Sequence, residues 1–244
     1  MRHLFMKNYL FVLLLLMGAT GQAAAQVVAS VTHLSGVLTA RHLDGSTKLL
    51  SVKSEVSKGD TLITEKSTFA RLKFNDNSEI VLRPGSELRI DQFNYDEAKP
   101  EADSLVVNML KGGMRAVSGL IGKRNRAAVQ YTTPTATIGI RGTHFGALYC
   151  SGDCTEVPTV GGTVPPDGLH VDVAQGAIDL TNDAGKVLVN TGEFGYVVGR
   201  SNLPILVSPE RGVQVTMPPS ISQNKSNSVG GMSKGANDAQ CAAQ

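Results

Sequence analysis

The segment TPTATIGIRGTHF, residues 133–145, carries the densest local pattern in this chain of 244 residues. Small and β-branched residues alternate in it with two glycines, Gly139 and Gly142. β-Branched residues favour strands, whereas a glycine inside a strand pattern marks a bend, a bulge or a close approach of two backbones. The segment therefore predicts short strands that meet at tight corners, as in a closely wound β structure.

Strand and turn patterns flank this segment on both sides. Residues 69–74 alternate apolar and basic side chains, which is typical of a strand with one buried face. Asp44-Gly45 and Pro84-Gly85 are turn signals between such strands. We predict an all-β fold of short strands in a solenoid-like or rolled arrangement, with a β-sandwich as the alternative.

Two stretches share one glycine spacing. Gly36 is followed nine residues later by Gly45, and Gly176 is followed nine residues later by Gly185. The spacing fits an internal repeat, but it also fits two hairpins that need a turn glycine at equivalent places. Both interpretations predict β structure.

The first 25 residues have the parts of a cleavable signal peptide. Arg2 and Lys7 give a positive start, residues 9–17 form a short apolar run, and Ala23 to Ala25 supply small residues for cleavage. The apolar run is shorter than the roughly 20 residues that span a bilayer, so a retained anchor is the weaker alternative. We expect an exported chain, periplasmic or secreted, with no membrane span after cleavage.

Charge and composition exclude several classes of function. The chain has 23 basic and 21 acidic residues, and the numbers become equal when Arg2 and Lys7 leave with the signal peptide. A nucleic-acid-binding protein normally carries a basic excess, so nucleic acid is not expected as a partner. Trp is absent and aromatic residues make up 5% of the chain. Sugar recognition by stacked rings is therefore disfavoured, whereas polar recognition of a polysaccharide stays open.

Neither catalysis nor a cofactor is predicted. The sequence contains no nucleophile elbow, phosphate-binding glycine loop or zinc-protease helix motif. His144 and His170 together with Cys150 and Cys154 lack the ligand spacing of a zinc site. We expect a non-enzymatic protein without a metal.

The cysteines predict one disulfide. Cys150 and Cys154 enclose three residues, a spacing that suits a small disulfide loop in an oxidising compartment. So short a loop constrains little unfolded-chain entropy, so the bond would mainly fix local geometry. Cys241 lies in a polar tail without an obvious partner and is either a free thiol or an intermolecular link.

Two groups of residues are candidate sites. The main basic concentration, interrupted by glycines, fits a mobile loop that docks an acidic partner, or simply a solvated flexible loop; its members are Lys111, Arg115, Lys123, Arg124 and Arg126. The second group belongs to the opening segment and consists of Gly139, Arg141, Gly142 and Thr143. Arg141 could hold a ligand carboxylate or phosphate in bidentate fashion, but we favour a structural role in which it spans a turn and binds backbone carbonyls.

The ordered set of segments resembles the FecR domain family. The segments that carry the likeness are 59–64, 70–74, 78–86, 110–115, 133–145, 171–176 and 187–193. This resemblance implies a FecR-like β domain over residues 26–200. A C-terminal extension over 201–217 follows, and the polar composition beyond it predicts a disordered tail over 218–244. The resemblance also implies a periplasmic module. In the best-known members of the family, a membrane helix joins this domain to a cytoplasmic segment that controls a sigma factor. We expect neither addition here, because a cleavable signal stands in their place.

Two hypotheses of function follow. The first is a periplasmic FecR-like interaction module that binds an envelope protein, in signalling or assembly, through exposed sheet edges or the basic loop. The second is a cell-wall or surface-polysaccharide binding protein. An envelope hydrolase ranks last, since no motif supplies a catalytic site.

Overall fold

The computed structural model describes residues 26–222 of the chain. The predicted signal peptide, Cys241 and most of the predicted tail lie outside the described residues. Half of the described residues are in strands and 9% are in helices, which confirms the all-β prediction. No helix within residues 26–222 is long and apolar enough to cross a membrane.

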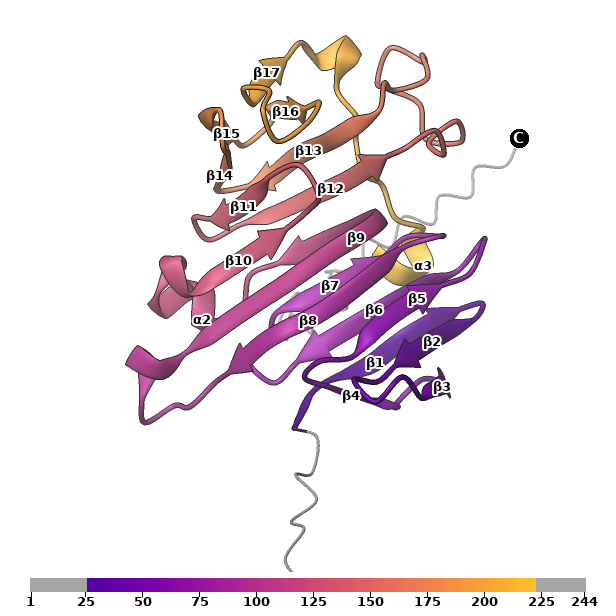
Figure 1. Cartoon of the computed structure of the whole chain (residues 1–244), viewed down its shortest axis with the longest axis vertical. Coiled ribbons are helices and arrows are strands. Elements are labelled where there is room, and N and C mark those ends of the chain that lie inside the picture. The colour runs from indigo at the N-terminus through magenta and orange to yellow at the C-terminus, as the bar shows by residue number, and fades with distance from the viewer. Residues whose placement is uncertain (1–25, 223–244) are drawn as a thin grey trace, which may run out of the picture.

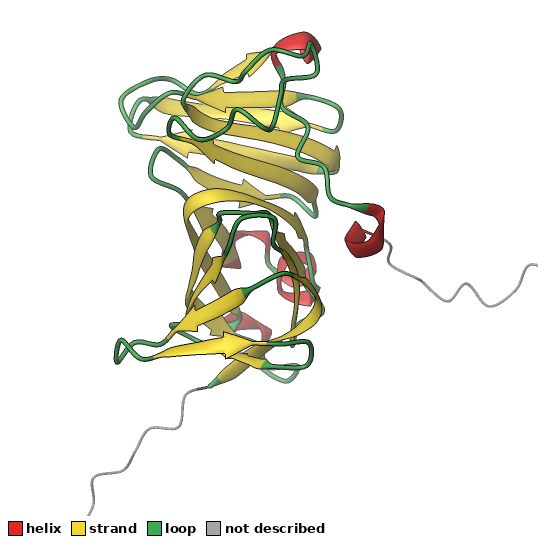
Figure 2. Ribbon diagram, turned by 90° about the vertical axis from the view of Figure 1, so that its right-hand side faces the viewer, coloured by secondary structure: helices red, strands yellow, loops and turns green. Residues whose placement is uncertain are grey.

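In residues 26–222, seventeen strands form one open sheet that is folded over into two layers (Figures 1 and 2). Layer A contains, in spatial order, β4 (Glu55–Ser57), β1 (Val27–Ser35), β6 (Phe69–Phe74), β7 (Glu79–Leu82), the second half of β9 (Ser104–Val117), β12 (His144–Cys150), β13 (Gly168–Gln175), β16 (Phe194–Val197) and β17 (Ile205–Val207). Layer B contains β3 (Thr47–Leu50), β2 (Leu38–Arg41), β5 (Thr61–Thr64), β8 (Glu87–Asn94), the first half of β9, β10 (Val129–Thr132), β11 (Thr137–Ile140), β14 (Ala177–Asn182) and β15 (Gly185–Asn190).

The long strand β9 connects the two layers. Its first half pairs with β8 and β10 in layer B, and its second half pairs with β7 and β12 in layer A. All strand pairings are antiparallel except that of β9 with β10. The strand changes layers at Gly112, whose φ of 76° is a left-handed conformation that residues with a Cβ rarely adopt.

One apolar core lies between the layers. Leu105, Val107 and Met109 enter it from the first half of β9, and Met114 and Ala116 enter it from the second half. Side chains alternate between the two faces of a strand, so these residues cover the core from both layers. Burying a side chain of this size stabilises the fold by about 1.5–3 kcal/mol.

The corners between layers share one backbone feature. At nearly every point where the chain passes from one layer to the other, a residue has a positive φ; these residues are Gly36, Lys53, Gly59, Ser67, Gly85, Gly112, Gly142, Gly176 and Gly192. Gly176 shows why the type of residue matters, because a Cβ there would lie 2.2 Å from the carbonyl oxygen of Gly142. Corners of a wound β structure, predicted from the opening segment, thus recur along the chain, and the arrangement is the rolled one.

The two stretches with equal glycine spacing occupy equivalent places. Gly36 and Gly176 each lie at a passage from layer A to layer B, and Gly45 and Gly185 each lie near the tip of a hairpin in layer B. The hairpins are β2–β3 and β14–β15, at opposite ends of the folded sheet (Figure 1). The spacing therefore marks a recurring structural unit, whichever origin it has.

The short helices lie in the connections. They are η1 (Pro100–Ala102), α2 (Leu120–Arg124), η2 (Arg126–Ala128), η3 (Pro209–Arg211) and α3 (Pro219–Ser222). The predicted flexible basic loop after β9 is instead helical in α2 and η2. Ile121 is fully buried, and the backbone N–H of Leu120 donates to the carbonyl oxygen of Asp76, so packing fixes this connection.

Candidate binding surfaces

The opening segment forms β11, a corner and the start of β12. Thr143 fastens the corner to the residue that follows β9, because the Ser118 hydroxyl accepts from the Thr143 backbone N–H at 2.9 Å and donates to its carbonyl oxygen at 3.0 Å. Gly142 has a φ of 71° at the corner itself. Gly142 and Thr143 therefore have structural positions, at the corner between β11 and β12.

Arg141 binds a carboxylate. Its guanidinium Nε and Nη2 donate to the two carboxylate oxygens of Asp179, on the neighbouring strand β14, at 3.0 and 3.2 Å. Lys186 on β15 contacts the same carboxylate at 3.1 Å. The prediction that Arg141 binds backbone carbonyls is wrong, because a fork of two N–H groups matches a carboxylate better than it matches a strand already paired on both sides.

A hollow lies beside this ion cluster on the outer face of layer B. It has a volume of about 510 Å³ and spans β10, β11 and β14, three adjacent strands of Figure 1. Gly139 lies in it and contributes no side chain, while Gln130, Thr137 and Thr181 supply polar groups. Arg126 and Arg141 also line it, so the structure unites one residue of the basic group with two of the second candidate group, Gly139 and Arg141.

Arg115 is separated from the other basic residues. It lies on the outer face of layer A, where Nε donates to His144 at 2.8 Å and Nη2 donates to Asp172 at 3.0 Å, and Nη1 binds the carbonyl oxygen of Val215. Its side chain is 15% exposed. Three intramolecular partners leave this guanidinium little capacity for a partner protein.

The remaining members of the basic group also differ in environment. Arg124 contacts the buried Asp103 carboxylate at 3.5 Å and lies over the Tyr95 ring at 5.1 Å. Lys111 lies 3.5 Å from the exposed Asp153 carboxylate. The structure thus does not bring the predicted basic group together, because β9, α2 and η2 carry its members to different faces.

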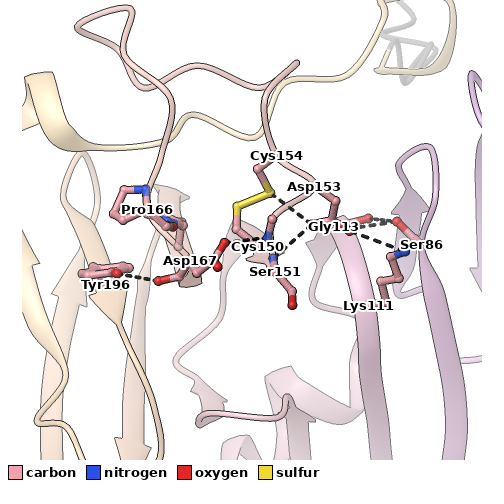
Figure 3. The surroundings of a disulfide bond; sticks show 12 residues. Ser86, Lys111, Gly113, Cys150, Ser151, Asp153, Cys154, Pro166, Asp167 and Tyr196 are labelled. Atoms are coloured by element: carbon pink, nitrogen blue, oxygen red, sulfur yellow. Dashed lines mark hydrogen bonds and ion pairs between the residues drawn. A yellow bond between two sulfur atoms is a disulfide. The ribbon is translucent and has the colours of Figure 1, made fainter.

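Cys150 and Cys154, the predicted disulfide pair, are bonded at the end of β12, with their Cα atoms 5.4 Å apart (Figure 3). Both sulfurs pack in a second, small apolar cluster on the outer face of layer A, with Leu148, Val213 and Val215. Residues 213–217, which we term the strap, cross this face toward α3. The figure also shows Lys111 on the side of the loop near Asp153.

Polar bonds hold the strap to layer A. Its Val215 backbone N–H donates to Asp172 at 2.9 Å, and its carbonyl oxygens at Val215 and Thr216 accept from Arg115 and Arg83. Gly146 leaves the space for Val215, since a Cβ at Gly146 would lie 2.5 Å from the Val215 Cβ. The sequence analysis missed this contact, although the apolar alternation of Val213, Val215 and Met217 was a usable signal.

The two histidines considered as metal ligands have partners other than the disulfide cysteines. His144 accepts from Arg115, and His170 contacts the carbonyl oxygen of Pro166 at 2.8 Å and stacks on Tyr196. Burial lowers the pKa of both imidazoles, and the nearby Arg115 adds to the effect at His144. Within residues 26–222, no cluster of three or more metal-binding side chains is present.

Comparison with known proteins identifies the central part of the chain. Residues 60–165 match the family model described as FecR protein. The chain contains a FecR domain. No curated protein matches the chain.

Structural likeness to solved proteins is partial. Two crystal structures of a candidate anti-sigma factor from Parabacteroides distasonis ATCC 8503 share 12% sequence identity with the chain, at a TM-score of 0.45. The alignment covers 62% of this chain and 60% of that one. A structure described as a cell surface anchoring domain shares 22% identity over 25% of this chain and 82% of its own length, at a TM-score of 0.25.

The matched FecR segment covers only part of each candidate surface. It includes Arg126, Gly139 and Arg141 of the hollow, but Asp179 and Thr181 come from β14, beyond the match. Asp179 and Lys186 were missed from sequence because no motif links them to Arg141. The alternation in residues 177–182 was the available signal, since it places Asp179 and Thr181 on one polar face.

The ends of the folded sheet beyond the FecR match are open. Among the described strands at one end, β15 pairs only with β14, and β17 pairs only with β16. Exposed apolar residues gather along these strands and the connections around them; they are Leu188, Val198, Leu203, Ile205 and Leu206. At the other end, the edge strands β3 and β4 have four and three residues.

Proposed function

We propose that this chain is an exported, non-enzymatic interaction module of the cell envelope, which binds an extended segment of a partner protein along the free edge of β15. The proposal places the mature chain in the periplasm or outside the cell, as the signal-peptide pattern suggests. The FecR domain supports a role in envelope signalling or assembly. The single observation that carries the proposal is the unpaired edge of β15.

The register of β15 shows which backbone groups are free. Its pairing with β14 runs without a shift from Asn182↔Gly185 to Ala177↔Asn190. In an antiparallel pair, alternate residues bond to the neighbouring strand, and the two-residue turn assigns these bonds to Gly185, Val187 and Val189. Lys186 and Leu188 therefore direct their backbone N–H and C=O groups outward, and within residues 26–222 neither makes a further backbone bond.

The side chains on this edge suit a partner strand. Lysine on an edge strand commonly discourages pairing, but the Lys186 ammonium is bound to Asp179. Leu188 is 37% exposed, and the exposed Leu206 lies on β17 at the same end. A partner strand would gain main-chain hydrogen bonds along β15 and apolar contact from these leucines.

This edge is favoured over the basic residues because most of those already have partners. Arg115 and Arg124 contact buried carboxylates, and Lys111 contacts Asp153. It is also favoured over the opposite end, where the edge strands are shorter and the pairing of β4 with β1 is irregular. A six-residue edge offers more main-chain bonds to a partner than a three- or four-residue one.

A photo-crosslinker placed at Leu206 in cells tests the proposal. We expect it to capture one envelope protein, whereas the same group at Leu49 on β3 should not. Leu188→Pro should abolish the crosslink, because it removes the outward N–H and spares the bonds to β14. Leu188→Thr keeps that N–H and should only reduce the yield.

Crosslinking that is equal from both ends, or that survives Leu188→Pro, would overturn edge pairing. Retention of the purified chain on peptidoglycan or polysaccharide, without a protein crosslink from Leu206, would favour the wall-binding alternative. Turnover of a wall substrate that one point mutation abolishes would contradict the non-enzymatic part of the proposal.

A further inference from the structure

The geometry points to a second binding site, separate from the edge of β15, on the outer face of layer B. We propose that the hollow over β10, β11 and β14 binds a carboxylate-bearing oligosaccharide of the uronic-acid type. Its anionic group would meet Arg126, and its hydroxyls would meet the surrounding threonine and amide side chains. The inference does not depend on strand pairing at β15.

The charge of the hollow favours an anion. Asp179 faces two cations, Arg141 and Lys186, so one positive charge remains after this carboxylate is counted. Arg126 adds a second, because it is exposed and has no carboxylate within 4 Å among the described residues. An exposed guanidinium without a carboxylate partner can bind a ligand carboxylate through charge-assisted hydrogen bonds.

The shape of the hollow favours an elongated ligand. A smaller hollow of about 210 Å³ shares Thr137 and Thr181 with the first one and continues toward Arg200. Thr135 lines it, is 6% exposed, and its hydroxyl oxygen has no hydrogen-bond partner among the described residues. We term these two adjoining hollows the groove; hydroxyl and amide side chains line both of them.

The strands beneath the groove favour a sugar over a peptide. β10, β11 and β14 each have a paired strand on both sides, so their backbone groups are already bonded. A peptide could not add there as a strand and would have to rely on side-chain contacts alone. Hydroxyl, amide and guanidinium groups suit a ligand that carries many hydroxyls and a carboxylate, without aromatic stacking.

Gly139 allows the groove to be filled without disturbing the fold. Its φ is not in the left-handed region, and a Cβ there would have no neighbour nearer than 3.7 Å, the Asp179 Cβ. Valine is favoured in strands. Gly139→Val should therefore keep the fold and occupy the space above the floor of the hollow.

Titration of the exported chain with an oligogalacturonate, followed by NMR, tests the site. We expect saturable binding with shifts confined to β10, β11 and β14, and weaker binding at higher ionic strength. Arg126→Ala should weaken it about tenfold or more, as expected for loss of a charge-assisted hydrogen bond. Gly139→Val should abolish it at an unchanged melting temperature, and Lys73→Ala on layer A is the matched control.

Two comparison ligands make the test specific. A neutral maltooligosaccharide of equal length should bind much more weakly, and so should an oligoglutamate of equal charge. Equal binding of either ligand, no binding of the oligogalacturonate, or full binding by Gly139→Val would overturn the proposal. Leu188→Pro should leave this binding unchanged, so failure of edge pairing and failure of this site are distinguishable.

Discussion

Arg115 and Lys111 lie four residues apart on β9, yet their surroundings differ. The Arg115 side chain is enclosed between layer A and the strap, where it neutralises the buried Asp172. The Lys111 side chain is 57% exposed, and its ammonium group contacts an exposed carboxylate. A buried charge that loses its partner is strongly destabilising, whereas an exposed ion pair contributes little because water screens it.

We predict that Arg115→Met lowers the free energy of unfolding by about 3 kcal/mol, because it leaves the Asp172 carboxylate buried without its cation. Lys111→Met should change it by less than about 1 kcal/mol. Urea denaturation followed by circular dichroism measures both. Similar values for the two variants would contradict the structural role assigned to Arg115.

His170 makes stability depend on pH. Burial lowers its pKa below the ordinary value of 6.5, so below that pH the unfolded chain binds more protons than the folded chain. We predict that the free energy of unfolding falls as the pH goes from about 7.5 to about 5.5, with a contribution of the same sign from His144. Urea denaturation across this range should show a flatter dependence for His170→Gln than for the parent chain. A parent-like slope for His170→Gln would contradict the prediction.

Among the elements, the strap depends on the disulfide loop. Val213 and Val215 are buried against Cys150 and Cys154, whereas the main core is built from other residues. In Figure 2 the C-terminal segment runs down one side of the folded sheet to α3. The disulfide therefore supports a contact on the outer face of layer A more than it supports the core between the layers.

We predict that reduction of the disulfide, or Cys154→Ser, loosens the strap while the strands stay folded. The bond closes a very short loop, so its loss should lower the free energy of unfolding by about 2 kcal/mol or less. Hydrogen exchange should accelerate in residues 213–217 and remain slow in β9. Unchanged exchange in the strap, or equal acceleration throughout, would show that the disulfide does not act locally.

The two-layer arrangement of the whole molecule depends on Gly112, where β9 passes from layer B to layer A. A Cβ there would lie 2.6 Å from the Ser86 Cα and 2.8 Å from the Gly85 carbonyl oxygen. Both contacts are to backbone atoms, which cannot move aside independently of β8. The position thus combines a left-handed conformation with close packing at the one strand common to both layers.

We predict that Gly112→Ala lowers the free energy of unfolding by about 3 kcal/mol or more, because strain and overpacking add. Gly152→Ala is the matched control: its φ of 74° is nearly the same, but no atom lies within 4 Å of the added Cβ. It should cost only about 1–2 kcal/mol of backbone strain. Thermal unfolding of the two variants gives the comparison, and equal losses would show that backbone conformation alone decides.

Much of the local structure follows from the sequence. Apolar alternation predicts β strands, and Gly142 of the opening segment marks a corner because few other residues adopt a positive φ, whereas Gly139 lies inside β11. The spacing of Cys150 and Cys154 predicts a disulfide, because only three residues separate the two cysteines. These features depend on neighbours within a few residues, so the sequence by itself determines them.

Only the tertiary structure decided which distant residues meet. Asp179 pairs with Arg141 because β14 lies beside β11. Arg115 lies away from the other basic residues because β9 changes layers between Lys111 and Arg115. The loop predicted to be flexible is instead the short helix α2, which packs through the buried Ile121. Strand order sets each of these contacts, and it depends on long-range pairing that local patterns do not encode.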